Sequence, residues 1–232
     1  MAERFGGFPP QGIGFLAGLA ADNTRTFFEA HRATYERELA APIRPFVTEV
    51  ADRLRTSVAP DLQAAPTVGK SLFRINRDLR FAKDKTPYNP WIDAIWWEGH
   101  TDARRAPAFI FRLAADHVVV GAGIMGRRGP RLDRYRRAVA DPHTGGALGS
   151  VLDQLRDTHA DVQLTQPTRQ RVPSPYPQDH PRGELLRLDA LHASRHLAHP
   201  DSIGTPRFAD WTADHLQPFA PLHRWLVDNL TP

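Results

Sequence analysis

Cationic side chains gather in one short stretch of this chain. Six lysines and arginines lie between residues 70 and 88, where only two aspartates oppose them, so the stretch carries the same net charge, +4, as the whole protein. The cations are Lys70, Arg74, Arg77, Arg80, Lys83 and Lys85. Arginine offers a planar fork of N–H donors to a phosphate or carboxylate, and lysine offers a compact point charge. The composition of this stretch therefore predicts binding of an anionic group.

The lysines alone point to the same stretch. The chain has 27 arginines and only three lysines, and Lys70, Lys83 and Lys85 all lie within 16 residues of one another. Lysine is more strongly hydrated than arginine, and its pKa shifts more readily. A chain that uses arginine elsewhere is therefore expected to need lysine here for a chemical reason.

We assign candidate roles to the side chains of a loop at residues 74–88. The predicted ligand-binding residues are Arg74, Arg77, Arg80, Lys83 and Lys85, and the predicted acid–base residues are Asp78, Asp84 and Tyr88. A carboxylate among cations has a lowered pKa, which makes it a poor acid but a usable weak base. The resulting hypothesis is a protein that binds an anionic small molecule, in one version as a metal-independent enzyme, and no cofactor is predicted.

Two other interpretations fit the same loop. Phe73, Phe81 and Tyr88 are interleaved with the cations, which is typical of surfaces that hold a phosphate backbone and stack bases. Alternatively, the loop is a structural or partner-binding element in which Asp78 and Asp84 neutralise neighbouring cations. Exposed ion pairs of that kind contribute only about 0–1 kcal/mol each.

Two further motifs match functional patterns incompletely. Residues 121–126 read GAGIMG, which fits the G-x-G-x-x-G fingerprint of dinucleotide-binding folds. The strand before it belongs to a predicted hairpin rather than a βαβ unit, so a glycine-rich strand end approached closely by another segment is the favoured interpretation. His192, His196 and His199 would share one face of a helix, as zinc ligands do, but Pro200 limits such a helix. No metal site is predicted.

The elements that must position the loop follow from hydrophobic periodicity. Residues 11–58 are predicted to be helical, with Asn23 as a cap and an i, i+3, i+4, i+7 stripe from Ile43 to Val58. Strands are predicted over about 71–124, at 71–75, 91–98, 108–113 and 117–124, and helices with a proline-rich loop over 130–232. This order predicts one α+β domain, 1–232, with a mainly antiparallel sheet in the middle and helices before and after it.

Composition sets the broad class. Hydrophobic residues make up 41% and charged residues 24% of the chain, as in ordinary globular proteins. Cysteine is absent, so disulfides and thiolate chemistry are excluded, and a reducing, cytoplasmic location is expected. No apolar run approaches the roughly 18 residues of a membrane span, so no membrane association is predicted.

Three stretches resemble one known family. They are FGGFPPQGIGFLAGLAADNTRTFFEAHRATYE, FRINRDLRFAKDKTPYNP and SPYPQDHPRGELLRLDAL. Through them the chain resembles the conserved-hypothetical family known as domain of unknown function 2461 over nearly its whole length, and the middle stretch is the most specific. The family usually has Trp-Phe where this chain has Phe27-Phe28. The resemblance implies a single bacterial-type α+β domain, and it transfers no catalytic residue.

Overall fold

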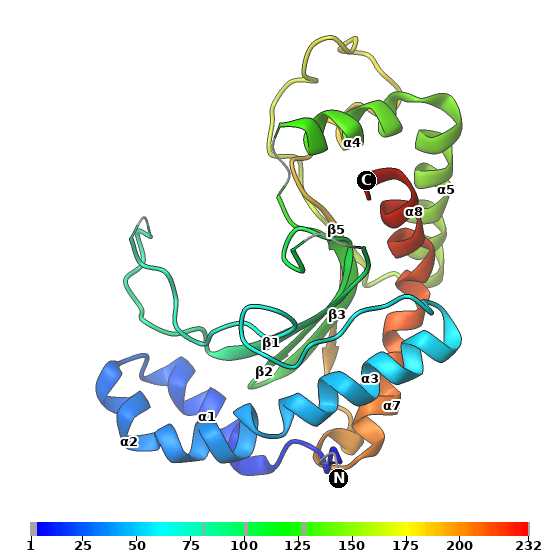
Figure 1. The fold of residues 1–232 in the computed structure, drawn as a ribbon. Coiled ribbons are helices and arrows are strands. Elements are labelled where there is room, and N and C mark those ends of the chain that lie inside the picture. Colours follow the sequence, from blue (N-terminus) through cyan, green and yellow to red (C-terminus); the bar gives the residue numbers. More distant parts are fainter. Residues whose placement is uncertain (1–3, 81, 100–101, 127–128, 232) are drawn as a thin grey trace.

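The computed structural model describes residues 4–80, 82–99, 102–126 and 129–231 (Figure 1). Helices precede and follow a five-stranded sheet, as predicted. The helices are α1 (Pro10–Ala21), α2 (Arg25–Tyr35), the π-helix η1 (Glu36–Ala40), α3 (Ile43–Ser57), α4 (Pro130–Ala140), α5 (Pro142–Thr158), α6 (Gly183–Leu186), η2 (Asp201–Gly204), α7 (Arg207–Leu216), η3 (Gln217–Phe219) and α8 (Ala220–Leu230). The strands are β1 (Trp91–Trp97), β2 (Ala108–Ala114), β3 (His117–Ile124), β4 (Gln163–Leu164) and β5 (Leu191–Ala198).

The sheet has the strand order β1-β2-β3-β5-β4, and every pairing is antiparallel. The three strands from 91 to 124 confirm the predicted ones, and β2 and β3 form the predicted hairpin. The expected strand at 71–75 was wrong. This segment makes isolated bridges along β1, such as Leu72 with Ala94, because only a few of its backbone groups reach that edge.

Strand β5 lies in a region for which only helices and a loop were predicted. It carries His192 and His196, while His199 lies just beyond its end. These three histidines are therefore not on a helix and do not share a helix face. Within the described parts of the chain, no group of three or more histidine, aspartate or glutamate side chains is placed to hold a metal ion.

One face of the sheet is covered by helices α3, α7 and α8 (Figure 1). Phe46 on α3 is the centre of an aromatic core there, with ring centroids 4.8 Å from Phe111 of β2, 5.0 Å from Phe5 and 5.6 Å from Phe208 of α7. The indole of Trp96 donates a hydrogen bond to the carbonyl of Val47 at 2.8 Å. These contacts fix the sheet against the helices. The other face is covered only in part, by a smaller apolar cluster in which residues 103 and 106 pack on β1 and β2.

The other face is concave, because the sheet bends where β3 meets β5 (Figure 1). A Cβ on Gly121 would lie 2.1 Å from the carbonyl oxygen of Ala193, and one on Gly123 would lie 2.4 Å from the Cβ of His192. Both glycines of β3 therefore permit a close approach of β5 that no other residue would allow. This confirms the strand-end interpretation of the GAGIMG motif.

The cationic loop forms an arm that projects away from the body of the molecule (Figure 1). We define the arm as residues 76–88, of which residue 81 lies outside the described residues. Its base is closed by a bridge between Asn76 and Tyr88 and by a hydrogen bond from Arg77 N to Pro87 O at 2.9 Å. The arm is thus a long hairpin-like excursion between the edge segment and β1.

Helix α2 is fixed to the base of the arm. Its cap is Thr24, which accepts a hydrogen bond from Phe27 N at 3.1 Å, and not Asn23 as predicted. The amide of Asn23 instead pairs with the backbone of Tyr88, accepting from its N–H and donating to its carbonyl, both at 3.0 Å. On the same helix, His31 is exposed, and its ring stacks on Phe27 with ring centroids 4.2 Å apart.

The proline-rich loop, residues 167–181, lies at the end of the molecule beside α4 (Figure 1). Directly after it, Arg182 donates hydrogen bonds to the carbonyls of Val139 and Ala140 at the end of α4, at 2.6 and 3.0 Å. Tyr176 and His180 contact each other edge to face. The loop therefore lies far from the arm (Figure 1).

Candidate functional site

The charged side chains of the arm pair largely with one another. Arg77 contacts Asp84 at 2.6 Å and also bonds to Thr86, while Arg80 holds Asp78 at 2.7 Å. Lys85 donates to the carbonyl of Leu79 at 3.1 Å. The pairs differ from those expected, because the arm folds back on itself and brings residue 77 opposite 84. Phe81, which was considered for base stacking, lies outside the described residues.

These contacts predict that the carboxyl groups of Asp78 and Asp84 are unusually acidic. Hydrogen bonds from Thr86 N–H, then from Arg77, lower the pKa of Asp84 from 3.8 to about 2, and Arg80 lowers that of Asp78 to about 2. A lowered pKa stabilises the folded arm above pH 3.8, and this contribution is lost as the pH falls toward 2. We expect a carbon-detected NMR titration to show both values.

The matched variants separate the two carboxylates. Arg77→Gln should raise the pKa of Asp84 only part of the way to 3.8, because the Thr86 N–H remains, and should leave Asp78 unchanged. Arg80→Gln should do the reverse. A carboxyl group of Asp84 that titrates near 3.8 in the wild-type protein would show that the arm is open in solution.

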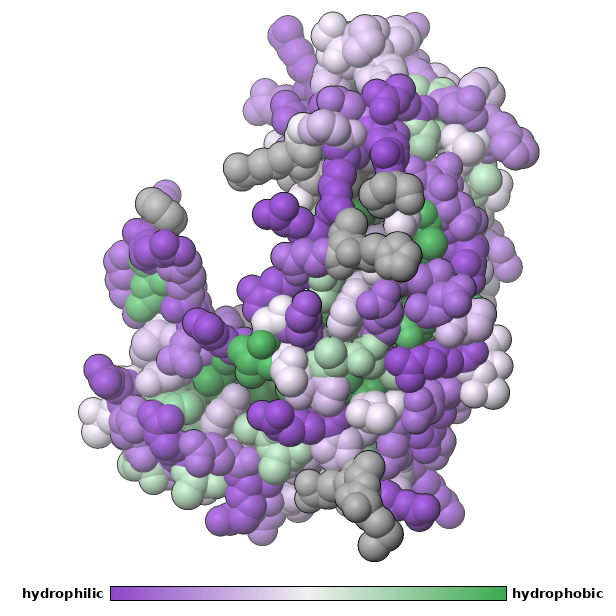
Figure 2. Space-filling view, in the orientation of Figure 1, coloured by the Kyte–Doolittle hydropathy of each residue, from purple (hydrophilic) through white to green (hydrophobic). Residues whose placement is uncertain are grey.

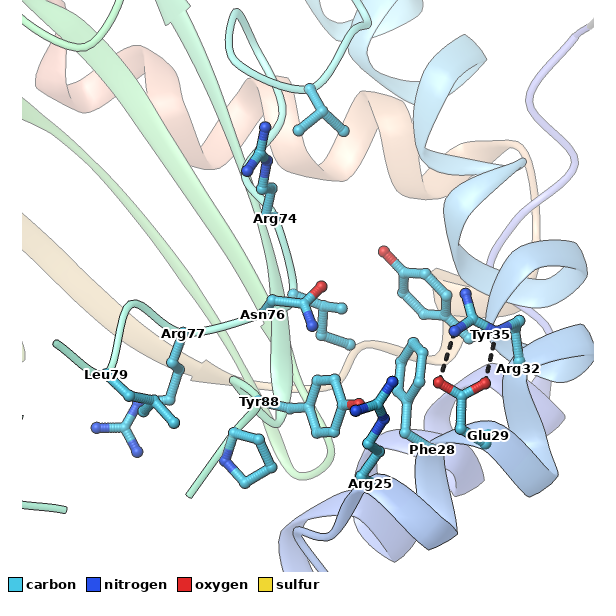
Figure 3. A pocket seen from close by; sticks show the side chains of 13 residues that line it. Arg25, Phe28, Glu29, Arg32, Tyr35, Arg74, Asn76, Arg77, Leu79 and Tyr88 are labelled. Carbon is cyan, nitrogen blue, oxygen red and sulfur yellow. Dashed lines mark hydrogen bonds and ion pairs between the residues drawn. The ribbon is translucent and has the colours of Figure 1, made fainter. Parts of the chain in front are cut away.

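A cleft of about 710 Å³ lies between α2 and the base of the arm (Figure 3). We call it the aromatic cleft. Tyr88 stacks on Phe28 of α2 with ring centroids 4.4 Å apart, and Phe28 also contacts Tyr35 at 5.5 Å. In Figure 3 the Tyr35 hydroxyl points into the cleft. Burial, followed by the nearby carboxylate of Glu36, raises the pKa of Tyr35, so this phenol is a hydrogen-bond donor at neutral pH.

Four arginines line the aromatic cleft from two separate segments. Arg25 and Arg32 come from α2, and Arg74 and Arg77 come from the edge segment and the arm. Arg32 is engaged by Glu29 in two hydrogen bonds, of 2.7 and 3.0 Å. This contact is the largest cause of the lowered pKa of Glu29, which is thereby a weak base. Arg77 is engaged by the arm, as described above.

Arg25 and Arg74 are the two arginines of the cleft whose guanidinium groups are unpaired among the described residues. Within the part of the chain that the structure describes, neither guanidinium makes a hydrogen bond or an ion pair. Both lie on exposed residues, Arg25 at the start of α2 and Arg74 on the edge segment, and Figure 3 shows them on opposite sides of Asn76 and Tyr88. Two free forks on one aromatic cleft are suited to a bound anion.

A second space, a trough of about 930 Å³, lies between the arm and Asp93 of β1, Asp102 and Arg104. It shares Arg74, Asn76 and Arg77 with the aromatic cleft. Figure 2 shows a hollow between the arm and the main body of the molecule, with apolar surface at the bottom of this hollow. The base of the arm is therefore a ridge between two open spaces.

The predicted site residues are distributed unequally over these spaces. Arg74, Arg77 and Tyr88 line the aromatic cleft, and Asp78 and Arg80 line only the trough. Among the described residues, Asp84, Lys83 and Lys85 line neither. The roles given to all these residues from sequence remain predictions, but the arrangement moves the centre of the site from the tip of the arm to its base.

Sequence reasoning did not find the α2 side of the cleft. These lining residues are Arg25, Phe28, Glu29, Arg32 and Tyr35. Their spacing of i, i+3, i+4, i+7 and i+10 is that of one helix face. Residues 27, 31, 35 and 39, which recur every four positions, lie on a neighbouring face of the helix. A search for a mixed aromatic and cationic stripe, rather than an apolar one, finds the correct face.

Fold and site together define a class of protein: an α+β protein with an antiparallel sheet, covered by helices on one face, and a cationic arm beside an arginine-lined cleft. The chain belongs to the family described as conserved hypothetical protein (DUF2461), whose family model matches residues 11–225. This confirms the resemblance seen in the sequence. No curated protein matches the chain. No helix in the described ranges is long and apolar enough to cross a membrane.

Proposed function

We propose that the protein binds a small molecule that carries a phosphate or carboxylate on an aromatic or other apolar body, in the aromatic cleft. The observation that supports this most directly is the pair of uncommitted guanidinium groups, Arg25 and Arg74, beside the stacked rings of Phe28 and Tyr88. The rings would contact the apolar body, and the two forks, with the hydroxyl of Tyr35, would contact the anion.

Binding is favoured over catalysis by the arrangement of the carboxylates. Asp78 and Asp84 do not line the aromatic cleft, and each is held by an arginine of the arm. Glu29, the carboxylate that does line it, is fixed by Arg32. Of the three predicted acid–base residues, Tyr88 alone faces the proposed ligand, so an enzymatic version would depend on this phenol.

The test is thermal melting and calorimetric titration with phenyl phosphate, benzoate and inorganic phosphate. A ligand at 100 times its Kd stabilises the native state by about 2.7 kcal/mol, which gives a clear shift in Tm. We expect phenyl phosphate to bind more tightly than inorganic phosphate, because the rings add contacts. Arg25→Gln and Arg74→Gln should each weaken binding about 10- to 100-fold, the loss expected for a charged hydrogen bond.

Arg156→Gln is the matched control for charge. Arg156 lies on α5, paired with Asp153 at 3.2 Å, so its loss changes the net charge equally without touching the cleft. Equal affinity in the wild type and both cleft variants, or no binding of any of the three anions, contradicts the proposal. The arm would then be a structural element whose internal ion pairs are its purpose.

A further inference from the structure

The face of the sheet opposite the helices contains a third space, which shares no described lining residue with the aromatic cleft. It is a hollow of about 310 Å³ over β1, β2, β3 and β5, and we call it the sheet hollow. This volume lies at the lower end of the range of small-molecule sites in proteins. Nothing in the function proposed above uses it.

The floor of the sheet hollow is aliphatic. The antiparallel register places Ile95 of β1 opposite Ile110 of β2, and Ile110 opposite Gly121 of β3. Val119 and Gly123 of β3 and Ala108 of β2 also line the hollow. A flat apolar body placed on this floor would contact side chains from three strands.

One wall of the sheet hollow is polar, and it comes from β5. His192, Ser194 and His196 alternate along the strand and so face the same side. Ser194 is only 6% exposed, and its hydroxyl makes no hydrogen bond among the described residues. The Nδ1 of His192 contacts the Thr165 hydroxyl at 2.9 Å, and its Nε2 makes no hydrogen bond among the described residues. The wall therefore presents a hydroxyl and an imidazole with which a bound molecule could form hydrogen bonds.

Two of the three described charged residues that line the sheet hollow neutralise each other. Arg112 pairs with both oxygens of Asp93, at 2.7 and 3.0 Å, and lies over the ring of Trp91 at 4.1 Å. Burial lowers the pKa of His192, and burial, His117 and Arg112 together lower that of His196. Both imidazoles are therefore neutral at pH 7. The remaining cation, Arg104, lies at the rim over Phe73.

We infer that the sheet hollow binds a neutral, planar heteroaromatic molecule. Its ring would lie on Ile95 and Ile110, and its polar edge would bond to Ser194 and His192. Alternate residues of a strand are about 7 Å apart, which matches a bicyclic heterocycle with hydrogen-bonding groups at its two ends. An anion would have only Arg104 as a cationic partner, because the guanidinium of Arg112 is already occupied by Asp93.

The test uses quinazolinone as a neutral bicyclic probe and benzoate as its anionic counterpart, each titrated into the full-length protein and followed by saturation-transfer NMR. Quinazolinone should bind, and benzoate should not bind at this site. Val119→Trp, which fills the hollow, should weaken quinazolinone binding by more than tenfold. Ser194→Ala, which removes one hydrogen bond and keeps the fold, should weaken it about 2- to 10-fold.

Val68→Trp is the control, because Val68 is exposed and lines the aromatic cleft instead. It should leave quinazolinone binding unchanged, and Val119→Trp should leave phenyl phosphate binding unchanged. The two proposals therefore fail separately. No quinazolinone binding to the wild type, unchanged binding in both Val119→Trp and Ser194→Ala, or displacement of quinazolinone by benzoate would overturn the inference.

Discussion

Replacing Glu98 by alanine should lower the free energy of unfolding by about 3 kcal/mol. Glu98 follows β1 and is only 5% exposed, and its carboxylate contacts Nε2 of His223 on α8 at 3.3 Å and Arg224 at 3.4 Å. The Nδ1 of His223 is buried and has no hydrogen-bond partner among the described residues. Alanine would therefore leave an imidazole with neither nitrogen satisfied, packed on Phe109 at 4.4 Å.

The measurement is denaturant and thermal unfolding, in which a loss of this size lowers Tm by about 6–12 °C. Glu98→Gln is the matched control, since its amide oxygen can still accept from His223, and it should cost less. Asp153→Ala removes a carboxylate from an exposed pair with Arg156 and should change stability little. Equal stability of Glu98→Ala and the wild type would mean that the buried contact contributes nothing to the docking of α8.

The same pair predicts how stability depends on pH. The hydrogen bond from His223, opposed by burial, lowers the pKa of Glu98 below its ordinary value of 4.5. A lowered folded-state pKa contributes stability that is complete above pH 4.5 and is lost as the pH falls through the folded value. Glu98→Gln has no such group, so its stability should fall less steeply than that of the wild type on acidification.

The fold was largely predictable because its periodic elements report on burial. The stripe from Ile43 to Val58 gave α3, and the alternation of Phe109, Phe111 and Leu113 gave β2, since in both cases one face of the element contacts the core. Strand β5 was not predicted, because it lacks such a periodic apolar pattern. Its outward side chains include His192 and His196, and its inward ones include the small Ala193, so no apolar alternation marks it.

The candidate site was only half predictable, because it is made by two segments that meet through tertiary contacts. The cations of the arm stood out by composition, but composition does not show that Arg77 is engaged by Asp84, seven residues on. Nor does it show that Asn23 joins α2 to Tyr88 across 65 residues, which is what brings Arg25 to the arm. These contacts depend on how the arm folds back, and no local pattern encodes that.

Gly121→Val should be the most damaging single substitution in the sheet, with a loss of about 3 kcal/mol in the free energy of unfolding. Its Cβ would lie 2.1 Å from Ala193 O and 2.8 Å from the Cα of Ser194, and both are backbone atoms that cannot rotate away. Strand β5 would have to move outward, which combines an overpacking cost of about 1–3 kcal/mol with the loss of ladder hydrogen bonds worth about 1 kcal/mol each.

Gly126→Ala, in the same GAGIMG motif, is the control for the stability loss expected in Gly121→Val. Among the described residues no atom lies within 4 Å of a Cβ at Gly126, and its backbone conformation is open to any residue, so alanine should leave stability unchanged or raise it by about 0.4–1 kcal/mol. Chemical denaturation of both variants measures the contrast. Equal losses at 121 and 126 would contradict this structural role. A loss confined to 121 means that Gly121 is required for the close pairing of β3 with β5.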